Sequence, residues 1–360
     1  MKSRLNVGII GCGVIAPTHI RSYLQQRDVE VACVCDQDES KASSLATEYD
    51  IKDYTAVPEE LLARDDIDCV SICTDHASHA ELAVAALEAG KHVLCEKALA
   101  ATTQGLDTMS HAHARNPELV FSGVFQHRFE RAPNLLKKWL AEGKFGDPLT
   151  ADTHLYCLRT DAYYNADQWR GTWAEEGGSV LINQAIHYID LLAWIMEGIT
   201  SVCGAFANLS HAEVIETEDT AVGACEFRNG ALGTIKATSS SHLKWEPEIG
   251  ITGTEGTIRL RGNELLRAEF EDQGRKTAIM QELDAGEDIP GIKAGKEYYG
   301  KGHLPQITDF VEAVRQGREP FVPGESARHA VDIVLALYQS HRQEQWVTVN
   351  DPNPTANPLS

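Results

Sequence analysis

The sequence predicts an α/β protein with two domains: a doubly wound parallel sheet, then an α+β domain with a large, open, mostly antiparallel sheet. Its 360 residues are more than one hydrophobic core usually serves. Up to residue 125, apolar strand-like runs alternate with helical patterns, as in a parallel sheet covered on both faces. From residue 200 to about 280, strand follows strand with no helix between, which indicates antiparallel pairing.

The first predicted domain covers residues 1–125. Strands are expected at 5–10, 29–35, 69–73, 92–95 and 119–125, and helices at 17–26, 39–49, 58–63, 80–89 and 103–115. Gly90 can take the left-handed conformation that ends a helix, and the strand at 92–95 begins two residues later. Glu96 and Lys97 directly follow the end of that strand. Ligands of open α/β sheets bind beyond the carboxyl ends of strands. We therefore expect a cofactor and a substrate to meet at Lys97.

The second predicted domain covers residues 126–350, and 351–360 reads as a loose tail. Helices are expected at 132–142, 181–196, 304–315 and 325–341, a glycine- and lysine-bearing loop at 286–302, and a last strand at 346–349. Strands at 221–227 and 231–237 flank Asn229-Gly230, the strongest short hairpin signal. An open sheet leaves one apolar face uncovered, which predicts a homodimer or homotetramer formed through that sheet.

The net charge argues against two classes of partner, and cysteine usage indicates the redox compartment. The net charge of −21 argues against nucleic acid and anionic membranes, and no stretch is long enough for a transmembrane helix. The nine cysteines are odd in number and form no Cys-x-x-Cys pair. Reduced thiols in the cytoplasm are therefore the better interpretation.

A glycine-rich turn predicts a dinucleotide site. Gly11-Cys12-Gly13-Val14-Ile15-Ala16 follows a strand and precedes a helix, where Gly11 permits the tight turn and Gly13 lets the backbone approach a pyrophosphate. Asp36, 25 residues after Gly11 and at the end of the second strand, is placed to bind an adenosine ribose. A carboxylate there repels a 2′-phosphate, so NAD is favoured over NADP.

The sequence resembles the glucose–fructose oxidoreductase, inositol dehydrogenase and MocA family over nearly its whole length. The resemblance rests on the turn at Gly11, on Ala86-Leu-Glu-Ala-Gly-Lys-His-Val-Leu-Cys-Glu-Lys97, and on Gly177-Gly-Ser-Val-Leu-Ile-Asn-Gln-Ala-Ile-His-Tyr-Ile-Asp190. It implies an NAD(P)-binding Rossmann domain, an open-faced sheet domain, and hydride transfer at a sugar or cyclitol carbinol. The family's Glu-Lys-Pro motif maps onto Glu96 and Lys97. Further positions matched to the family's cofactor and substrate contacts are Thr74, His79, Gln126, Trp169 and Arg170.

Three positions depart from the family pattern. Ala98 replaces the usual proline after Glu-Lys, so the resemblance does not carry a cis peptide bond over to it. Asp75 stands where a proline usually follows Thr74. Asn183 replaces the aspartate often found four residues before the histidine, so an ionised carboxylate is missing there.

Oxidising a carbinol needs a base for the hydroxyl proton and a positive group beside the forming oxyanion. Asn183 and His187 are four apart on one predicted helix and share a face, with Asp190 near that face. We assign His187 as the base in oxidation and Lys97 as its proton partner or as the stabiliser of the alkoxide. The reverse assignment, with neutral Lys97 as base, stays open. Asn183 orients the substrate by hydrogen bonds, and we hypothesise that catalysis rests on Lys97 and His187 without an acidic third member.

The remaining histidines fit structural roles better, and no spacing on a single element predicts a metal site. The aromatic loop containing Tyr163, Trp169 and Trp173 fits sugar stacking, an oligomer contact or simple packing, the first two about equally. Tyr298, Tyr299 and His303 are candidates for the pocket rim. Two rival functions stay open: an NAD-using glycosidase with transient oxidation, and a non-enzymatic dinucleotide-binding regulator.

Overall fold

The computed structural model describes residues 4–285 and 301–350. The described chain forms two compact units, one of residues 4–126 with 301–328 and one of residues 127–285 with 329–350. The predicted tail and residues 286–300 of the predicted loop, with Tyr298 and Tyr299, lie outside the described residues. Among the described helices, none combines the length and apolarity that crossing a membrane requires.

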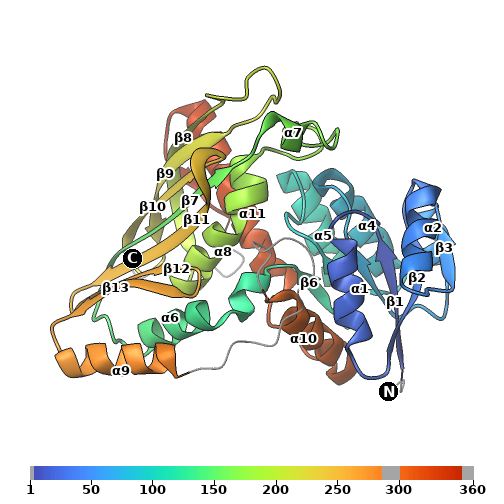
Figure 1. Ribbon diagram of the computed structural model, residues 1–360, viewed down its shortest axis with the longest axis horizontal. Coiled ribbons are helices and arrows are strands. Elements are labelled where there is room, and N and C mark those ends of the chain that lie inside the picture. Colours follow the sequence, from blue (N-terminus) through green and yellow to red (C-terminus); the bar gives the residue numbers. More distant parts are fainter. Residues whose placement is uncertain (1–3, 286–300, 351–360) are drawn as a thin grey trace. The chain divides into compact units, whose positions relative to one another are not determined.

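The first unit is a six-stranded, fully parallel sheet, as predicted (Figure 1). Its strand order is β3-β2-β1-β4-β5-β6. From β1, successive strands are added first on one side, as β2 and β3, and then on the other side, as β4, β5 and β6. The strands are β1 (Leu5–Ile10), β2 (Val29–Cys35), β3 (Asp53–Thr55), β4 (Cys69–Ile72), β5 (His92–Cys95) and β6 (Phe121–Gly123). The helices are α1 (Ala16–Leu24), α2 (Glu39–Glu48), α3 (Pro58–Leu62), α4 (His76–Glu88), α5 (Thr103–Arg115) and α10 (His303–Gln316). The switch between β1 and β4 is where sheets of this type bind ligands.

The short apolar strands of this unit are buried in a core that helices on both faces of the sheet complete. Val7 and Ile9 of β1 are fully buried, together with Ile20 of α1 and Phe310 of α10. Helix α10, from the far end of the chain, therefore supplies part of this core. Strand β3 was not predicted, because this edge strand is largely exposed and carries no apolar run.

The second unit is an eight-stranded sheet in the order β13-β12-β11-β7-β10-β9-β8-β14. All its pairs are antiparallel except β7 with β10, which confirms a mostly antiparallel sheet. Its strands are β7 (Pro148–Leu158), β8 (Ile199–Ala207), β9 (Thr220–Phe227), β10 (Leu232–Thr238), β11 (Ser240–Gly253), β12 (Gly256–Arg261), β13 (Glu264–Phe270) and β14 (Val347–Thr348). The helical segments are η1 (Gln126–Phe129), α6 (Arg131–Ala141), α7 (Asp161–Tyr164), η2 (Val180–Ala185), α8 (Ile186–Ile195), α9 (Gln273–Asp284) and α11 (Gly324–Gln343), of which η1 and α11 cross the boundary between the units.

Three predictions for this unit need correction. Strand β7, near the sheet centre, was missed, because buried Ala151, Thr153 and Leu155 alternate with polar residues and form no continuous apolar run. Residues 273–284, expected within the run of strands, form α9, which Asp272 caps by accepting two backbone N–H groups. The helix expected at 181–196 begins as the π-helical segment η2 and becomes α-helical only at Ile186. The predicted hairpin at Asn229-Gly230 is confirmed, with Gly230 at φ +84°.

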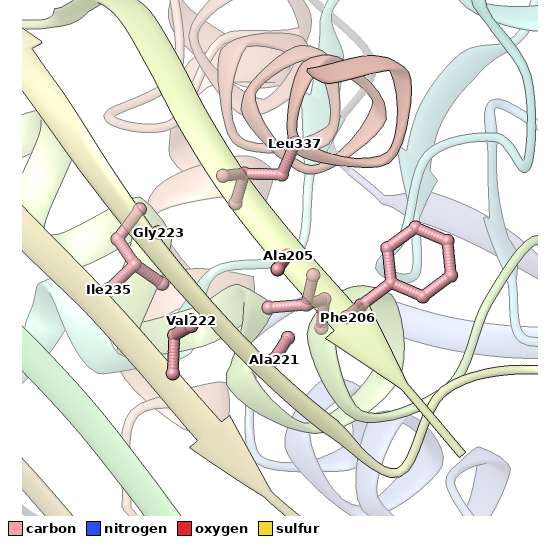
Figure 2. A pocket seen from close by; sticks show the side chains of 8 residues that line it. Ala205, Phe206, Ala221, Val222, Gly223, Ile235 and Leu337 are labelled. Atoms are coloured by element: carbon pink, nitrogen blue, oxygen red, sulfur yellow. The ribbon is translucent and has the colours of Figure 1, made fainter. Parts of the chain in front are cut away.

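One face of this sheet is packed and the other is exposed. Leu337 of α11 lies over Gly204 and Gly223, where an added Cβ would come within 2.9 and 2.6 Å of Leu337 Cδ2. Figure 2 shows Leu337 beside a small apolar hollow, which contains no predicted site residue and is lined by Leu181, Ala205, Phe206, Ala221, Val222, Gly223, Ile235 and Leu337.

The exposed face was expected to be apolar, and that expectation is only partly right. Val222 and Leu232 are 49% and 56% exposed. Thr234 and Lys236 of β10 are also exposed on this face. Lys236 is paired with Val222, and its Nζ lies 5.1 Å from the centre of the Tyr156 ring. The face is therefore mixed in character.

Candidate functional site

The turn between β1 and α1 has the geometry that a diphosphate requires. Gly11 has φ +94°, and an added Cβ would lie 2.6 Å from the Cys73 carbonyl, so only glycine fits there. At Gly13 an added Cβ would meet nothing within 4 Å, which leaves the turn open to a ligand. Helix α1 begins after Ile15 without a side-chain cap, and its first residue, Ala16, is fully buried against the sheet. The open turn and the uncapped helix terminus therefore fit a bound phosphate group.

Asp36 is tied directly to this turn. Its Oδ2 accepts the Cys12 N–H at 2.8 Å and its Oδ1 accepts the Asp38 N–H at 2.9 Å. Burial and the nearby Asp36 carboxylate raise the pKa of the Cys12 thiol to about 12, so that thiol stays neutral. The carboxylate thus lies at the end of β2 beside the glycine turn, as ribose recognition requires.

The segment after β4 is braced by short hydrogen bonds. Asp75 caps α4 by accepting the Ser78 N–H at 3.1 Å, and the Ser78 hydroxyl donates to Thr74 Oγ1 at 2.7 Å. His79 is fully buried, with its ring nitrogens 2.7 Å from the Ala98 carbonyl and 3.2 Å from the Thr74 carbonyl. Burial lowers the pKa of His79. The imidazole therefore links the segment after β4 to the segment after β5, and its contact with a cofactor stays a prediction.

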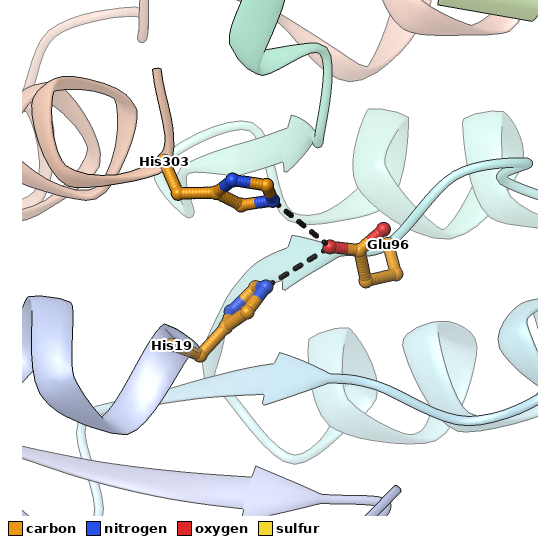
Figure 3. Close-up of side chains that lie close together, drawn as sticks. All are labelled: His19, Glu96 and His303. Atoms are coloured by element: carbon orange, nitrogen blue, oxygen red, sulfur yellow. Dashed lines mark hydrogen bonds and ion pairs between the residues drawn. The ribbon is translucent and has the colours of Figure 1, made fainter. Parts of the chain in front are cut away.

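Glu96 is held by two histidines from other elements (Figure 3). Its Oε1 lies 3.0 Å from His19 Nε2 of α1 and 3.8 Å from His303 Nε2 of α10. Its Oε2 accepts the backbone N–H of Lys97 at 3.1 Å. Burial alone would raise the pKa of Glu96, but the two histidines hold it well below its ordinary value. The carboxylate is therefore ionised, and it fixes the backbone from which Lys97 projects.

Lys97 itself follows β5, at the carboxyl edge of the sheet, and is half-buried. The Lys97–Ala98 peptide bond is cis, although alanine stands in place of proline. Gln126, at the end of this unit, is buried, and Gly302 packs so closely that an added Cβ would lie 1.8 Å from the Gln126 carbonyl. His303 was expected at a pocket rim, but it lies buried against Glu96.

His19, Glu96 and His303 also form a potential metal-ligand set. One ligand atom from each lies within 4.8 Å of the others, and all three residues are buried. These ligands come from α1, α10 and the segment after β5, so spacing within a single element could not predict them. Hydrogen bonding to a buried carboxylate accounts for the same arrangement, and the prediction that the protein holds no metal stays a prediction.

In the second unit, Glu218 fixes the start of η2. Its Oε1 accepts the N–H groups of Ser179 and Leu181 at 3.1 and 2.9 Å, and the Tyr338 hydroxyl donates to the same carboxylate at 2.7 Å. Gly178 has φ +147°, and an added Cβ would lie 2.0 Å from the Tyr338 hydroxyl oxygen. Glycine is therefore required at position 178, directly before the segment that carries Asn183.

Asn183 contacts a carboxyl group that the sequence analysis missed. Its Nδ2 donates to Glu176 Oε1, and the Gly171 N–H donates to Glu176 Oε2. Glu176 is 1% exposed, and burial raises its pKa to about 7. One signal in the sequence could have indicated this contact: Glu176 directly precedes Gly177-Gly178, in a chain that has asparagine in place of aspartate at position 183. The carboxyl group of Glu176 therefore lies beside Asn183, although position 183 itself carries no carboxylate.

His187 lies in the first turn of α8 and is partly exposed. Its ring centroid is 5.0 Å from that of His127, whose Nδ1 lies 2.7 Å from Glu130 Oε1. Sequence reasoning missed this pair, although a histidine and a glutamate three residues apart were the signal. Asp190, expected near the face of His187, is instead buried in an ion pair with Arg128.

Trp169 and Arg170 lie in an aromatic cluster. The Arg170 guanidinium is 4.8 Å from the Trp169 ring and 4.3 Å from the Tyr163 ring, and its Nε donates to Asp167 at 2.8 Å. Gln184 of η2 donates to the Tyr163 hydroxyl at 2.9 Å. The loop is therefore attached to the segment that carries Asn183.

Two family models match the chain. The NAD-binding Rossmann fold of an oxidoreductase family matches residues 5–124, and the C-terminal alpha/beta domain of the same family matches residues 137–349. Myo-inositol 2-dehydrogenase of Thermotoga maritima is 24% identical over 96% of this chain and 99% of that protein. D-glucoside 3-dehydrogenase of Escherichia coli is 26% identical over 94% and 96%.

A solved structure is also similar over the full fold. The WlbA dehydrogenase of Chromobacterium violaceum, in complex with NADH and UDP-GlcNAcA, has a TM-score of 0.86 and 26% identity, covering 97% of each chain. The fold of this chain is thus shared over nearly its whole length with a dehydrogenase of known structure.

Proposed function

Since this chain belongs to the glucose–fructose oxidoreductase, inositol dehydrogenase and MocA family of oxidoreductases, we propose that it is an NAD-dependent dehydrogenase of sugars or cyclitols. The observation that carries the proposal is the bond between Asp36 and the open glycine turn. A bound nicotinamide cofactor supplies the acceptor or donor of hydride. The chain's own residues bind and orient the reactants and move the proton.

Residues 1–125 bind the dinucleotide in this proposal. The backbone around Gly11, Gly13, Val14 and Ile15 receives the diphosphate at the amino end of α1. Asp36 accepts hydrogen bonds from the adenosine ribose, and its charge opposes a 2′-phosphate, which favours NAD over NADP. Around the nicotinamide, the proposed contacts are Thr74, His79, Glu96, Lys97 and Gln126.

Lys97 and His187 divide the proton work on the substrate hydroxyl. His187 takes the proton in oxidation, while Lys97 stabilises the developing alkoxide with its positive charge. Asn183 orients the substrate by hydrogen bonds and takes no proton at neutral pH. Trp169 and Arg170 contact the remainder of the substrate. Of the predicted substrate domain, residues 126–350, the part that forms this domain is 127–285 with 329–350, since residues 301–328 belong to the first unit.

The substrate class follows from the relatives. Proteins similar to this chain are named for inositol and for D-glucosides, and a similar structure holds a UDP-linked sugar acid. All of these compounds present ring carbinols. A ring carbinol of a sugar, cyclitol or sugar derivative is therefore the proposed site of hydride transfer.

One experiment separates this function from its rivals. Purified protein is incubated with NAD and a panel of sugars and cyclitols, NADH absorbance is followed, and aryl-glycoside hydrolysis is assayed in parallel. Net NADH formation supports the dehydrogenase. Aglycone release without net NADH would identify a glycosidase instead, and tight NAD binding without either reaction would identify a regulator.

The location and assembly of the protein complete the proposal. All nine cysteines are free and seven of them are buried, which supports a reducing compartment such as the cytoplasm. Exposed Val222 and Leu232 on the sheet support a homodimer or homotetramer formed through that face. Sedimentation of wild type and of Leu232→Glu tests the assembly, because the introduced charge should shift an oligomer toward monomer.

A further inference from the structure

Glu176 is a buried carboxyl group that the proposed proton transfers do not use. It lies in the second unit, between the aromatic loop and η2, and is 1% exposed. A buried polar group needs hydrogen-bond partners, and a buried charge needs them more. Its position next to Asn183 therefore requires an explanation beyond packing.

The carboxyl group of Glu176 is fixed from both sides. The Gly171 N–H donates to Oε2, and the Asn183 amide donates to Oε1. Its backbone is fixed as well, since the N–H groups of Glu176 and Gly177 donate to the Thr172 carbonyl at 3.3 and 3.1 Å. Gly171 in turn has no room to move toward Ile215, because an added Cβ would lie 2.2 Å from that side chain. The carboxyl group is thus a rigid partner for Asn183.

The protonation state of Glu176 determines the orientation of the Asn183 side-chain amide. A side-chain amide donates only through its nitrogen and accepts only through its oxygen, while an ionised carboxylate only accepts. Ionised Glu176 therefore holds Asn183 Nδ2 and directs Oδ1 away from itself. Protonated Glu176 can donate its O–H to Oδ1, and the nitrogen then points away.

We infer that Glu176 is a positioning residue whose ionisation state decides which end of the Asn183 amide is turned toward the substrate. The inference rests on the proposed function for one part only, namely that Asn183 binds a hydroxyl group of the substrate beside the one that is oxidised. With Glu176 ionised, Oδ1 accepts a hydrogen bond from that neighbouring hydroxyl, and the O–H of the oxidised carbinol stays available to His187. With Glu176 protonated, the amide offers a donor in place of an acceptor.

The groups facing Glu176 place this change near neutral pH. Burial is the main reason that its pKa rises to about 7, and the Glu218 carboxylate adds to the rise, while the Arg170 guanidinium opposes it. The other titratable neighbours are Tyr164 and Tyr338, whose pKa values are raised by burial, so both hydroxyls are neutral in this range. Substrate binding should therefore strengthen as the pH rises through about 7.

The first test compares Glu176→Gln with Glu175→Gln. Both variants remove one negative charge, but Glu175 is exposed. The glutamine introduced at 176 accepts from Gly171 and donates to Asn183 Oδ1, which imitates the protonated state. At pH 8 we expect kcat/KM to fall about 10- to 100-fold, mainly through KM. The inflection of 1/KM near pH 7 should disappear, while Glu175→Gln should match wild type.

A second test needs no turnover. Infrared difference spectra of the full-length protein follow the C=O stretch of a protonated carboxylic acid between pH 5 and 9. A band present in wild type and absent in Glu176→Gln reports on Glu176 alone. In Asn183→Ala its midpoint should rise by about 1 pH unit or more, because the donor that stabilises the carboxylate is lost.

Two outcomes would overturn the inference. One is a Glu176→Gln variant whose KM and pH profile match those of Glu175→Gln. The other is a wild-type band that does not titrate, or whose midpoint is the same in Asn183→Ala. If no sugar or cyclitol is oxidised but the infrared midpoint shifts as expected, the coupling of the two side chains stands and the proposed function alone fails.

Discussion

Removing one partner of the buried ion pair between Arg128 and Asp190 should destabilise the second unit strongly. The Arg128 guanidinium donates to both carboxylate oxygens of Asp190, at 2.8 and 2.5 Å, and the side chains are 3% and 1% exposed. Truncation at Asp190 removes the carboxylate that two guanidinium N–H groups contact and leaves that guanidinium buried. For such pairs the loss in free energy of unfolding is about 3–5 kcal/mol.

Asp190→Ala tests this magnitude, and the double variant Arg128→Met with Asp190→Leu tests its cause. The double variant removes both charges and fills similar volume, so its free energy of unfolding should stay close to that of wild type. Thermal unfolding followed by circular dichroism measures both. For a unit of this size the single variant should melt about 6–20 °C below wild type.

Glu142→Ala is the matched control, because it breaks two pairs at the surface, those of the 43% exposed Glu142 with Lys138 and Lys144. Exposed pairs contribute less than about 1 kcal/mol. If Asp190→Ala is no less stable than Glu142→Ala, the reasoning from burial and pairing is wrong. A double variant as unstable as Asp190→Ala would show that packing, and not the unpaired charge, is responsible.

Three further predictions concern the two halves of the candidate site. Asp36→Ala should lower the ratio of kcat/KM for NAD to that for NADP by at least about tenfold, measured at saturating substrate, because the charge that opposes a 2′-phosphate is removed. The pKa of Glu96 is held well below 4.5, so its ionised form stabilises the fold. The stability advantage of wild type over Glu96→Gln should be full above pH 4.5 and shrink as the pH falls below it, as urea unfolding across pH would show. Gly178→Ala should cost more than about 1 kcal/mol in thermal unfolding, because of the clash with Tyr338 and the left-handed backbone; an unchanged melting temperature would contradict the close approach.

The sequence was sufficient where the signal is local. Apolar strands, the turn at Gly11 and the carboxylate of Asp36 follow one another in register, and each could be read from a short window. The hairpin at Gly230 is of the same kind. These features depend on neighbours along the chain, so they could be predicted without knowledge of the fold.

The remainder depends on contacts between distant segments. His19, Glu96 and His303 come from three elements, and no spacing in the chain brings them together. Glu176 lies in a loop, where periodicity gives no information, and its partner Asn183 lies in the π-helical segment η2, whose start is fixed by the distant Glu218. Helical wheels also assume α-helical spacing, which fails across η2.

The first unit is closed by a part of the chain that is made late. Ile307 and Phe310 of α10 belong to the same core as β1 and α1, although more than half of the chain separates them. On a ribosome, residues 4–126 would wait roughly 10–35 s for residues 301–328 at ordinary rates of synthesis. During that interval the apolar surface meant for α10 has no partner from its own chain. We therefore expect a fragment ending at residue 125 to be poorly soluble, and early synthesis to be the stage at which the nascent protein most needs a chaperone.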